Sequence, residues 1–123
     1  MKPFCEVIVG DVLPALRALL AKELIELGLN QTQISRKLGI TQPAVSQYMR
    51  ELRGQGVRML TSNRKTADLI KNLAHELATG DVKASELHMR ICGICKNIRD
   101  ERMLCKLHHE TYPTLEQCDI CFK

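Results

Sequence analysis

Aromatic residues are nearly absent from this chain: they make up 3% of its 123 residues, and tryptophan does not occur. Sheet-rich folds draw heavily on aromatic and β-branched residues, so this scarcity disfavours them. A glycine-rich phosphate loop is also missing, and no nucleophile stands with a base in a catalytic arrangement. The length fits one domain of roughly 100 to 200 residues. We expect a mainly α protein that is not an enzyme and has no evident small-molecule substrate.

Long apolar runs are missing too. No stretch approaches the roughly 20 consecutive apolar residues that a membrane-spanning helix requires. The first residues also lack the pattern of a secretory signal. We therefore expect a cytoplasmic protein with no membrane partner. A reducing compartment disfavours structural disulfides, so the six cysteines favour metal or redox chemistry.

The positive charge is concentrated in one part of the chain. Residues 29–58 alone carry a net charge of +4, equal to that of the whole chain, with one acidic residue, Glu51, against five basic ones: Arg36, Lys37, Arg50, Arg53 and Arg58. A local basic patch is what a polyanionic partner requires, because neutralising phosphates releases counterions. An ordinary solvated basic face would have the same composition.

Leucines at helical spacing predict two longer helices. The first runs from Pro14 to Gly28, and the second covers residues 63–80. The second helix needs an apolar partner, which is either the core of the first domain or the same helix of a second subunit. The preceding "FCEVIVGDVL" fits either a strand or a packed helical turn, and residues 57–62 are expected to be a linker.

Two short helices are predicted between Asn30 and Gly56. Asn30 is a good N-cap for the first helix, and Gly39 stops it. Thr41 caps the second helix, in whose first turn Pro43 is harmless. The inward positions of these two helices are Ile34, Leu38, Val45, Tyr48, Met49 and Leu52. Two helices joined by a turn of about three residues containing glycine describe a helix-turn-helix.

This segment resembles the helix-turn-helix of XRE-type, phage-repressor-like transcription factors. The matching residues are Gln31, Ile34, Leu38, the turn "LGIT", Gln42, Val45 and "VSQYM". The resemblance implies that the helix from Gln42 to about Arg53 lies in the major groove of double-stranded DNA. It also implies a homodimer that reads a pseudo-palindrome. The helix at 64–79 is the candidate for holding the second subunit, unless it only completes a monomer core.

The resemblance assigns the DNA contacts residue by residue. The outward positions of the recognition helix are Gln42, Ala44, Ser46, Gln47 and Arg50. Glutamine bonds adenine and arginine bonds guanine in a bidentate way. Gln31 and Thr32 would bind backbone phosphate at a helix N-terminus. The charge comes from Arg36, Lys37 and Arg53. Pro43 stands where the family often has a polar, groove-facing residue, so shape or apolar contact replaces a polar contact there.

Five of the six cysteines lie between residues 92 and 121. They are Cys92, Cys95, Cys105, Cys118 and Cys121, and the first and last pairs are spaced C-x-x-C. Such a pair places two sulfurs within reach of one metal, and two pairs make a tetrahedral set. His108, three residues after Cys105, is a possible replacement ligand. Cys5 is remote, and a lone cysteine is more often a small buried hydrophobe.

Three interpretations of these thiols stay open. An iron-sulfur cluster, in its 4Fe–4S form, uses four thiolates and tolerates irregular spacing. Zinc bound by Cys92, Cys95, Cys118 and Cys121 would staple a segment that has too few apolar residues to fold alone. A metal-free thiol switch is the third.

The order of segments resembles small archaeal predicted transcriptional regulators. This resemblance spans nearly the full chain and implies only a regulator. From the order of segments we expect a DNA-binding domain over 1–61, an amphipathic helix over 62–83 that is the candidate for dimerisation, and a cysteine-rich metal- or cluster-binding tail over 84–123. The resulting hypothesis is a regulator that senses redox state or iron through the cluster. The alternatives are a regulator with a purely structural zinc site and a zinc-stapled protein-interaction module.

Overall fold

The computed structural model of the chain describes residues 6, 8–50, 52 and 54–101, and these are helical apart from short turns. Five α-helices and one π-helical turn come first: η1 (Ile8–Val12), α2 (Leu13–Glu26), α3 (Gln31–Leu38), α4 (Gln42–Arg50), α5 (Gln55–Ser62) and α6 (Arg64–Thr79). The last element described is α7 (Ala84–Asp100). No strand occurs among these residues, which confirms the mainly α prediction.

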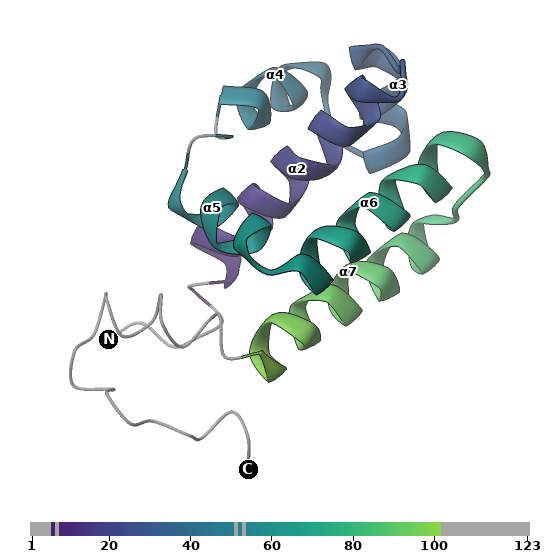
Figure 1. Ribbon diagram of the computed structural model, residues 1–123. Helices are drawn as coiled ribbons and strands as arrows, with labels where there is room; N and C mark the ends of the chain where they lie inside the picture. Colours follow the sequence, from purple (N-terminus) through teal and green to yellow (C-terminus); the bar gives the residue numbers. More distant parts are fainter. Residues whose placement is uncertain (1–5, 7, 51, 53, 102–123) are drawn as a thin grey trace.

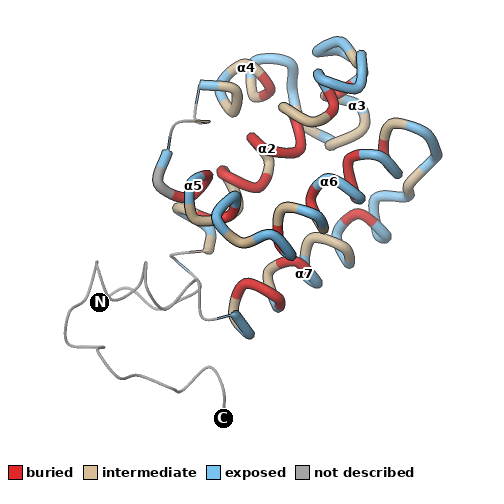
Figure 2. Tube along the Cα trace, in the orientation of Figure 1, coloured by how far each residue is buried: buried red, intermediate tan, exposed pale blue. Residues whose placement is uncertain are grey.

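Helix α2 lies at the centre of the fold and contacts η1, α3, α4, α5 and α6 (Figure 1). A proline opens it, as the sequence predicts. Leu16, Leu20 and Leu24 are fully buried along its length, and Figure 2 shows the buried residues gathered on the helices that surround it. One hydrophobic core therefore joins α2 to every element between η1 and α6.

The prediction of a linker at 57–62 is wrong, because these residues belong to α5. Val57 and Leu60, three residues apart, are buried against the core. The helix has only 8 residues, with Gly54 as its N-cap and Gly56 in its first turn, so its apolar period is too short to stand out in the sequence. The ambiguous stretch before α2 is also helical where it is described, ending in η1.

Helix α6 packs within the chain, against α2, α5 and α7. Its buried apolar residues are Ile70, Leu73, Ala74 and Leu77, and they form one face of the helix that the sequence predicts at 63–80. Asn63 caps its N-terminus by accepting a hydrogen bond from the backbone N–H of Thr66 at 3.0 Å. The core of the same chain therefore supplies the apolar partner that this helix needs.

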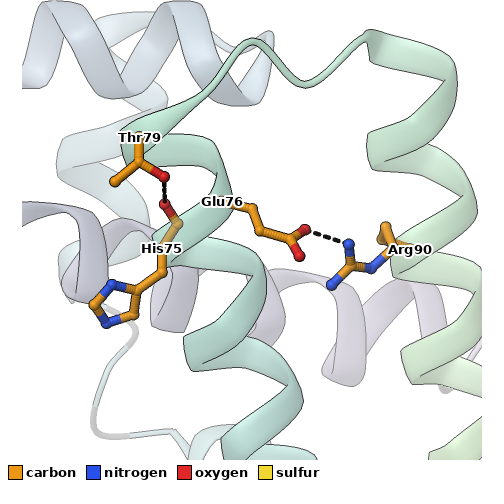
Figure 3. A network of polar contacts seen from close by, with 4 residues as sticks. All are labelled: His75, Glu76, Thr79 and Arg90. Carbon is orange, nitrogen blue, oxygen red and sulfur yellow. Dashed lines mark hydrogen bonds and ion pairs between the residues drawn. The ribbon is translucent and has the colours of Figure 1, made fainter.

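Helix α7 turns back along α6 after a short link (Figure 1). Leu87, Ile94 and Ile98 are buried. The Asn97 amide donates a hydrogen bond of 3.0 Å to the Thr66 hydroxyl, in a buried position between the two helices. Nearer the link, Arg90 pairs with Glu76 (Figure 3). Packing and polar contacts thus fix α7 on α6.

Candidate nucleic-acid interface

A sharp three-residue turn sets the angle between α3 and α4. Asn30 and Gln33 form a capping box at the start of α3, in which each side chain accepts a 2.9 Å hydrogen bond from the other's backbone N–H. Gly39 ends α3 in the left-handed region, with φ +67°, a conformation that costs glycine little. The Thr41 hydroxyl then accepts a 3.2 Å hydrogen bond from the backbone N–H of Ala44. These caps confirm the predicted start and end of α3 and the predicted start of α4.

The inner side of the two helices is apolar. Ile34 of α3 and Val45 of α4 are fully buried and belong to the common core. Partly buried Leu38, Tyr48 and Met49 pack around them. The inward positions predicted for these helices are therefore confirmed.

The outer side of α4 is polar and open to solvent. Pro43, Gln47 and Arg50 are exposed and share one face because they are spaced at i, i+4 and i+7. Gln42 is exposed beside them at the start of the helix, while Ala44 and Ser46 are half-buried. The exposed side chains offer an amide and a guanidinium, which are groups that read base edges.

The first turns of the two helices are tied together. The Gln42 side-chain amide donates a hydrogen bond to the Thr32 hydroxyl. This bond holds the Gln42 side chain against α3. The side-chain carbonyl oxygen of Gln42 and its second amide proton are then the groups available to a ligand. Gln31, next to Thr32, is exposed at the same end of α3.

The predicted basic residues have different surroundings. Arg36 is exposed on the outer side of α3 and Arg50 on the outer side of α4. Lys37 is half-buried, and its ammonium donates a 3.2 Å hydrogen bond to the carbonyl oxygen of Gly80, in the link between α6 and α7. Arg53 lies outside the described residues. Lys37 therefore makes an intramolecular contact with another segment of the chain, which the sequence does not indicate.

A further contact missed by sequence reasoning joins α2 to α4. The Arg17 guanidinium lies 5.9 Å from the centroid of the Tyr48 ring, and its Nη1 donates a 3.5 Å hydrogen bond to the Tyr48 hydroxyl. Both side chains are half-buried. Since Tyr48 directly follows Gln47, this pair helps to fix the rotation of α4 about its own axis.

Two of the predicted metal ligands lie on α7. Cys92 is exposed and Cys95 is half-buried, both as free thiols in the interior of the helix. Burial raises the pKa of the Cys95 thiol, and the charge of nearby Cys92 raises it further. No three metal-ligating side chains come together anywhere in the described parts of the chain. Cys5, Cys105, His108, Cys118 and Cys121 lie outside them.

A family model described as Helix-turn-helix matches residues 20–61. These residues form a helix-turn-helix domain. The match begins inside α2, includes α3 and α4 and ends inside α5, and it indicates a DNA-binding regulator of transcription. No curated protein and no solved structure matches the chain. Of the helices described, none is long and apolar enough to cross a membrane.

Proposed function

We propose that this chain is a sequence-specific transcription regulator that reads the major groove with α4. The proposal rests on the outer face of α4, where Gln47 and Arg50 are exposed while Val45 of the same helix is buried. Burial of Val45 holds the helix in one orientation, and the exposed side chains then point to where base edges would lie. The charge of Arg36 on the neighbouring helix favours phosphate contact without sequence preference.

The experiment compares two exposed residues, Gln47, which we expect to read base sequence, and Arg36, which we expect to contact phosphate in any sequence. An operator is first selected from a pool of random duplexes, and binding is then measured against salt concentration for operator and random DNA. We expect Gln47→Ala to lose discrimination at one base pair, by about 1–3 kcal/mol. We expect Arg36→Ala to weaken all sequences alike and to reduce the salt slope by about 1. Equal weakening of every sequence by Gln47→Ala would contradict the assignment of the recognition face.

The proposed active form is a homodimer. A helix-turn-helix that reads a pseudo-palindrome needs two copies, with half-sites about 34–36 Å apart or a multiple of that spacing. A selected operator with two inverted half-sites at such a spacing supports this proposal, and a single isolated half-site would contradict it. We assign no catalytic activity to the chain.

The proposed effector centre is an iron-sulfur cluster held by the cysteines from Cys92 onward. The donor set fits such a group, because five thiols occur within thirty residues and two of them share one helix face. Bound there, the cluster would supply a redox-sensitive, thiolate-ligated centre that responds to iron or oxidant. Cys92 and Cys95 would hold it from α7.

Anaerobic purification tests the nature of this centre. Brown protein that contains iron and acid-labile sulfide supports the cluster. Colourless protein with about one zinc per chain would instead support the structural-zinc alternative and remove redox sensing. Zinc would leave the DNA-binding proposal intact, since that rests on α3 and α4.

A further inference from the structure

Cys92 and Cys95 lie three residues apart in the middle of α7, well inside its limits of Ala84 and Asp100. Residues at i and i+3 of a helix share a face, with about 5–6 Å between their Cβ atoms. In zinc ribbons and knuckles, by contrast, a C-x-x-C pair lies on a turn. The helical setting of this pair therefore fixes the separation of the two Cβ atoms in a way that the spacing alone does not.

This separation suits a metal better than a disulfide. Two metal–sulfur bonds of about 2.3 Å in tetrahedral geometry place the sulfurs about 3.8 Å apart, and two side chains leaning toward one ion meet that distance. A disulfide requires its Cβ atoms at about 3.5–4.5 Å, which is closer than an intact helical turn provides. Closing a Cys92–Cys95 disulfide would therefore distort α7.

The helix is anchored on both sides of the pair. Arg90 pairs with Glu76 two residues before Cys92, and Asn97 bonds Thr66 two residues after Cys95. Ile94, between the cysteines, is 3% exposed and lies in the core. Figure 3 shows the ion pair between α6 and α7 from close by. Sites on packed helices are held more precisely than sites on loops, so the two thiols are positioned before any ligand arrives.

Access from solvent also favours a ligand. Cys92 is exposed, so an ion can reach the pair from solvent, while Cys95 is half-buried beside it. The same helix presents exposed Lys96 and half-buried Arg99 after the pair. Burial raises the pKa of the Cys95 thiol, so a metal ion must displace the thiol proton when it binds. Soft thiolate ligands select ions such as zinc, Cu(I) and the iron of iron-sulfur clusters.

We propose that Cys92 and Cys95 form a preformed two-thiolate half-site on α7 that binds a thiophilic metal ion without the other cysteines. The inference rests on the proposed function in taking these two thiols as metal ligands. It adds that the pair captures metal on its own and that it does not act as a dithiol–disulfide switch. Further thiolates complete the coordination after capture.

The test uses the whole 123-residue chain with Cys5, Cys105, Cys118 and Cys121 all changed to serine. Cys92 and Cys95 are then the remaining thiols. Cobalt(II) is added without oxygen, because its thiolate absorption grows with the number of bound thiolates. We expect this four-serine variant to bind one cobalt per chain with the absorption of two thiolates, and wild type to show a more intense band.

Two further changes in the four-serine variant sharpen the result. Cys92→Ser should weaken cobalt binding more than about 100-fold, since even loss of an outer-shell partner costs about 10- to 100-fold. The control is Met89→Ser, which removes a sulfur that is 75% exposed on the same helix one turn earlier and should leave cobalt binding unchanged. Equal losses for both variants would overturn the proposal.

The remaining outcomes separate this inference from the function on which it rests. If wild type binds metal and the four-serine variant does not, the half-site is refuted while the proposed centre stands. If neither binds cobalt, iron or zinc, both fail. Mild oxidation provides an independent measure: both thiols of the four-serine variant should stay titratable. Rapid formation of a Cys92–Cys95 disulfide with unchanged helix content would overturn the proposal in favour of a thiol switch.

Discussion

Two glycines within helices have opposite surroundings. At Gly56, near the start of α5, an added Cβ would clash with the carbonyl oxygen of Asp11 and come within 3.0 Å of the Ala15 Cβ. At Gly93, in the interior of α7, an added Cβ would meet nothing within 4 Å. The lack of a side chain at Gly56 therefore allows α5 to pack closely against α2. At Gly93 the lack of a side chain is not needed for any close contact among the described residues.

We expect alanine at these two positions to change stability in opposite directions. Gly56→Ala should destabilise the fold by about 1–3 kcal/mol, because the Asp11 backbone in η1 and the Ala15 side chain in α2 must move to relieve the overlap. Gly93→Ala should stabilise it by about 0.5–1 kcal/mol, because alanine has the higher helix propensity. Urea unfolding of the metal-free protein gives both values. A stabilising Gly56→Ala would contradict the close packing of α5 on α2.

Much of the helix-turn-helix can be predicted from individual residues. The caps at Asn30 and Thr41, the turn glycine and the burial of Val45 all follow from local chemistry and helical periodicity. The contact between Lys37 and Gly80 does not, because it joins residues 43 positions apart. Periodicity shows only that Lys37 lies to one side of α3, and the position of the link depends on how α6 packs.

Two polar contacts that hold α7 on α6 differ in how far they are buried. Asn97 and Thr66 meet in a buried position, whereas Arg90 and Glu76 are 36% and 50% exposed. Loss of one partner from a buried hydrogen bond leaves the other desolvated, at a cost of about 1–3 kcal/mol. An exposed ion pair contributes about 0–1 kcal/mol. The buried bond should therefore dominate the attachment of this helix.

Asn97→Ala and Arg90→Met test this order. We expect Asn97→Ala to lower the free energy of unfolding by about 1–3 kcal/mol and to speed amide hydrogen exchange along α7. Arg90→Met should cost at most about 1 kcal/mol and leave exchange nearly unchanged. Faster exchange in the Arg90 variant than in the Asn97 variant would show that the ion pair, not the buried bond, holds the helix.

Helices α2 and α6 could be predicted from the sequence because apolar residues recur in them over several turns. The short α5 was missed because two glycines precede an apolar period of barely two turns. In α7 the cysteines direct attention to metal chemistry, although Leu87, Ile94 and Ile98 continue a helical stripe through them. A C-x-x-C spacing is compatible with both a turn and a helix, so only the surrounding apolar positions distinguish the two.

At the scale of the whole molecule, the helix that carries Cys92 and Cys95 and the proposed recognition helix contribute to one hydrophobic core. Helix α7 packs on α6, α6 on α2, and α2 on both α3 and α4. Lys37 adds a direct polar contact from α3 to the link that precedes α7. Helix α7 is therefore connected to the proposed DNA-binding helices by a short series of contacts, through the link and through the common core.

Substitution of Lys37 tests that route, with Arg36 as the matched neighbour. Lys37→Met keeps the aliphatic stem and removes the ammonium. If Lys37 bonds the Gly80 carbonyl and does not contact phosphate, Lys37→Met should leave the salt slope of DNA binding unchanged. Arg36→Ala should reduce that slope by about 1. Metal loading should alter DNA affinity in wild type and alter it less in Lys37→Met. A reduced salt slope together with undiminished metal response in the Lys37 variant would show instead that this side chain leaves Gly80 to bind phosphate when DNA is present.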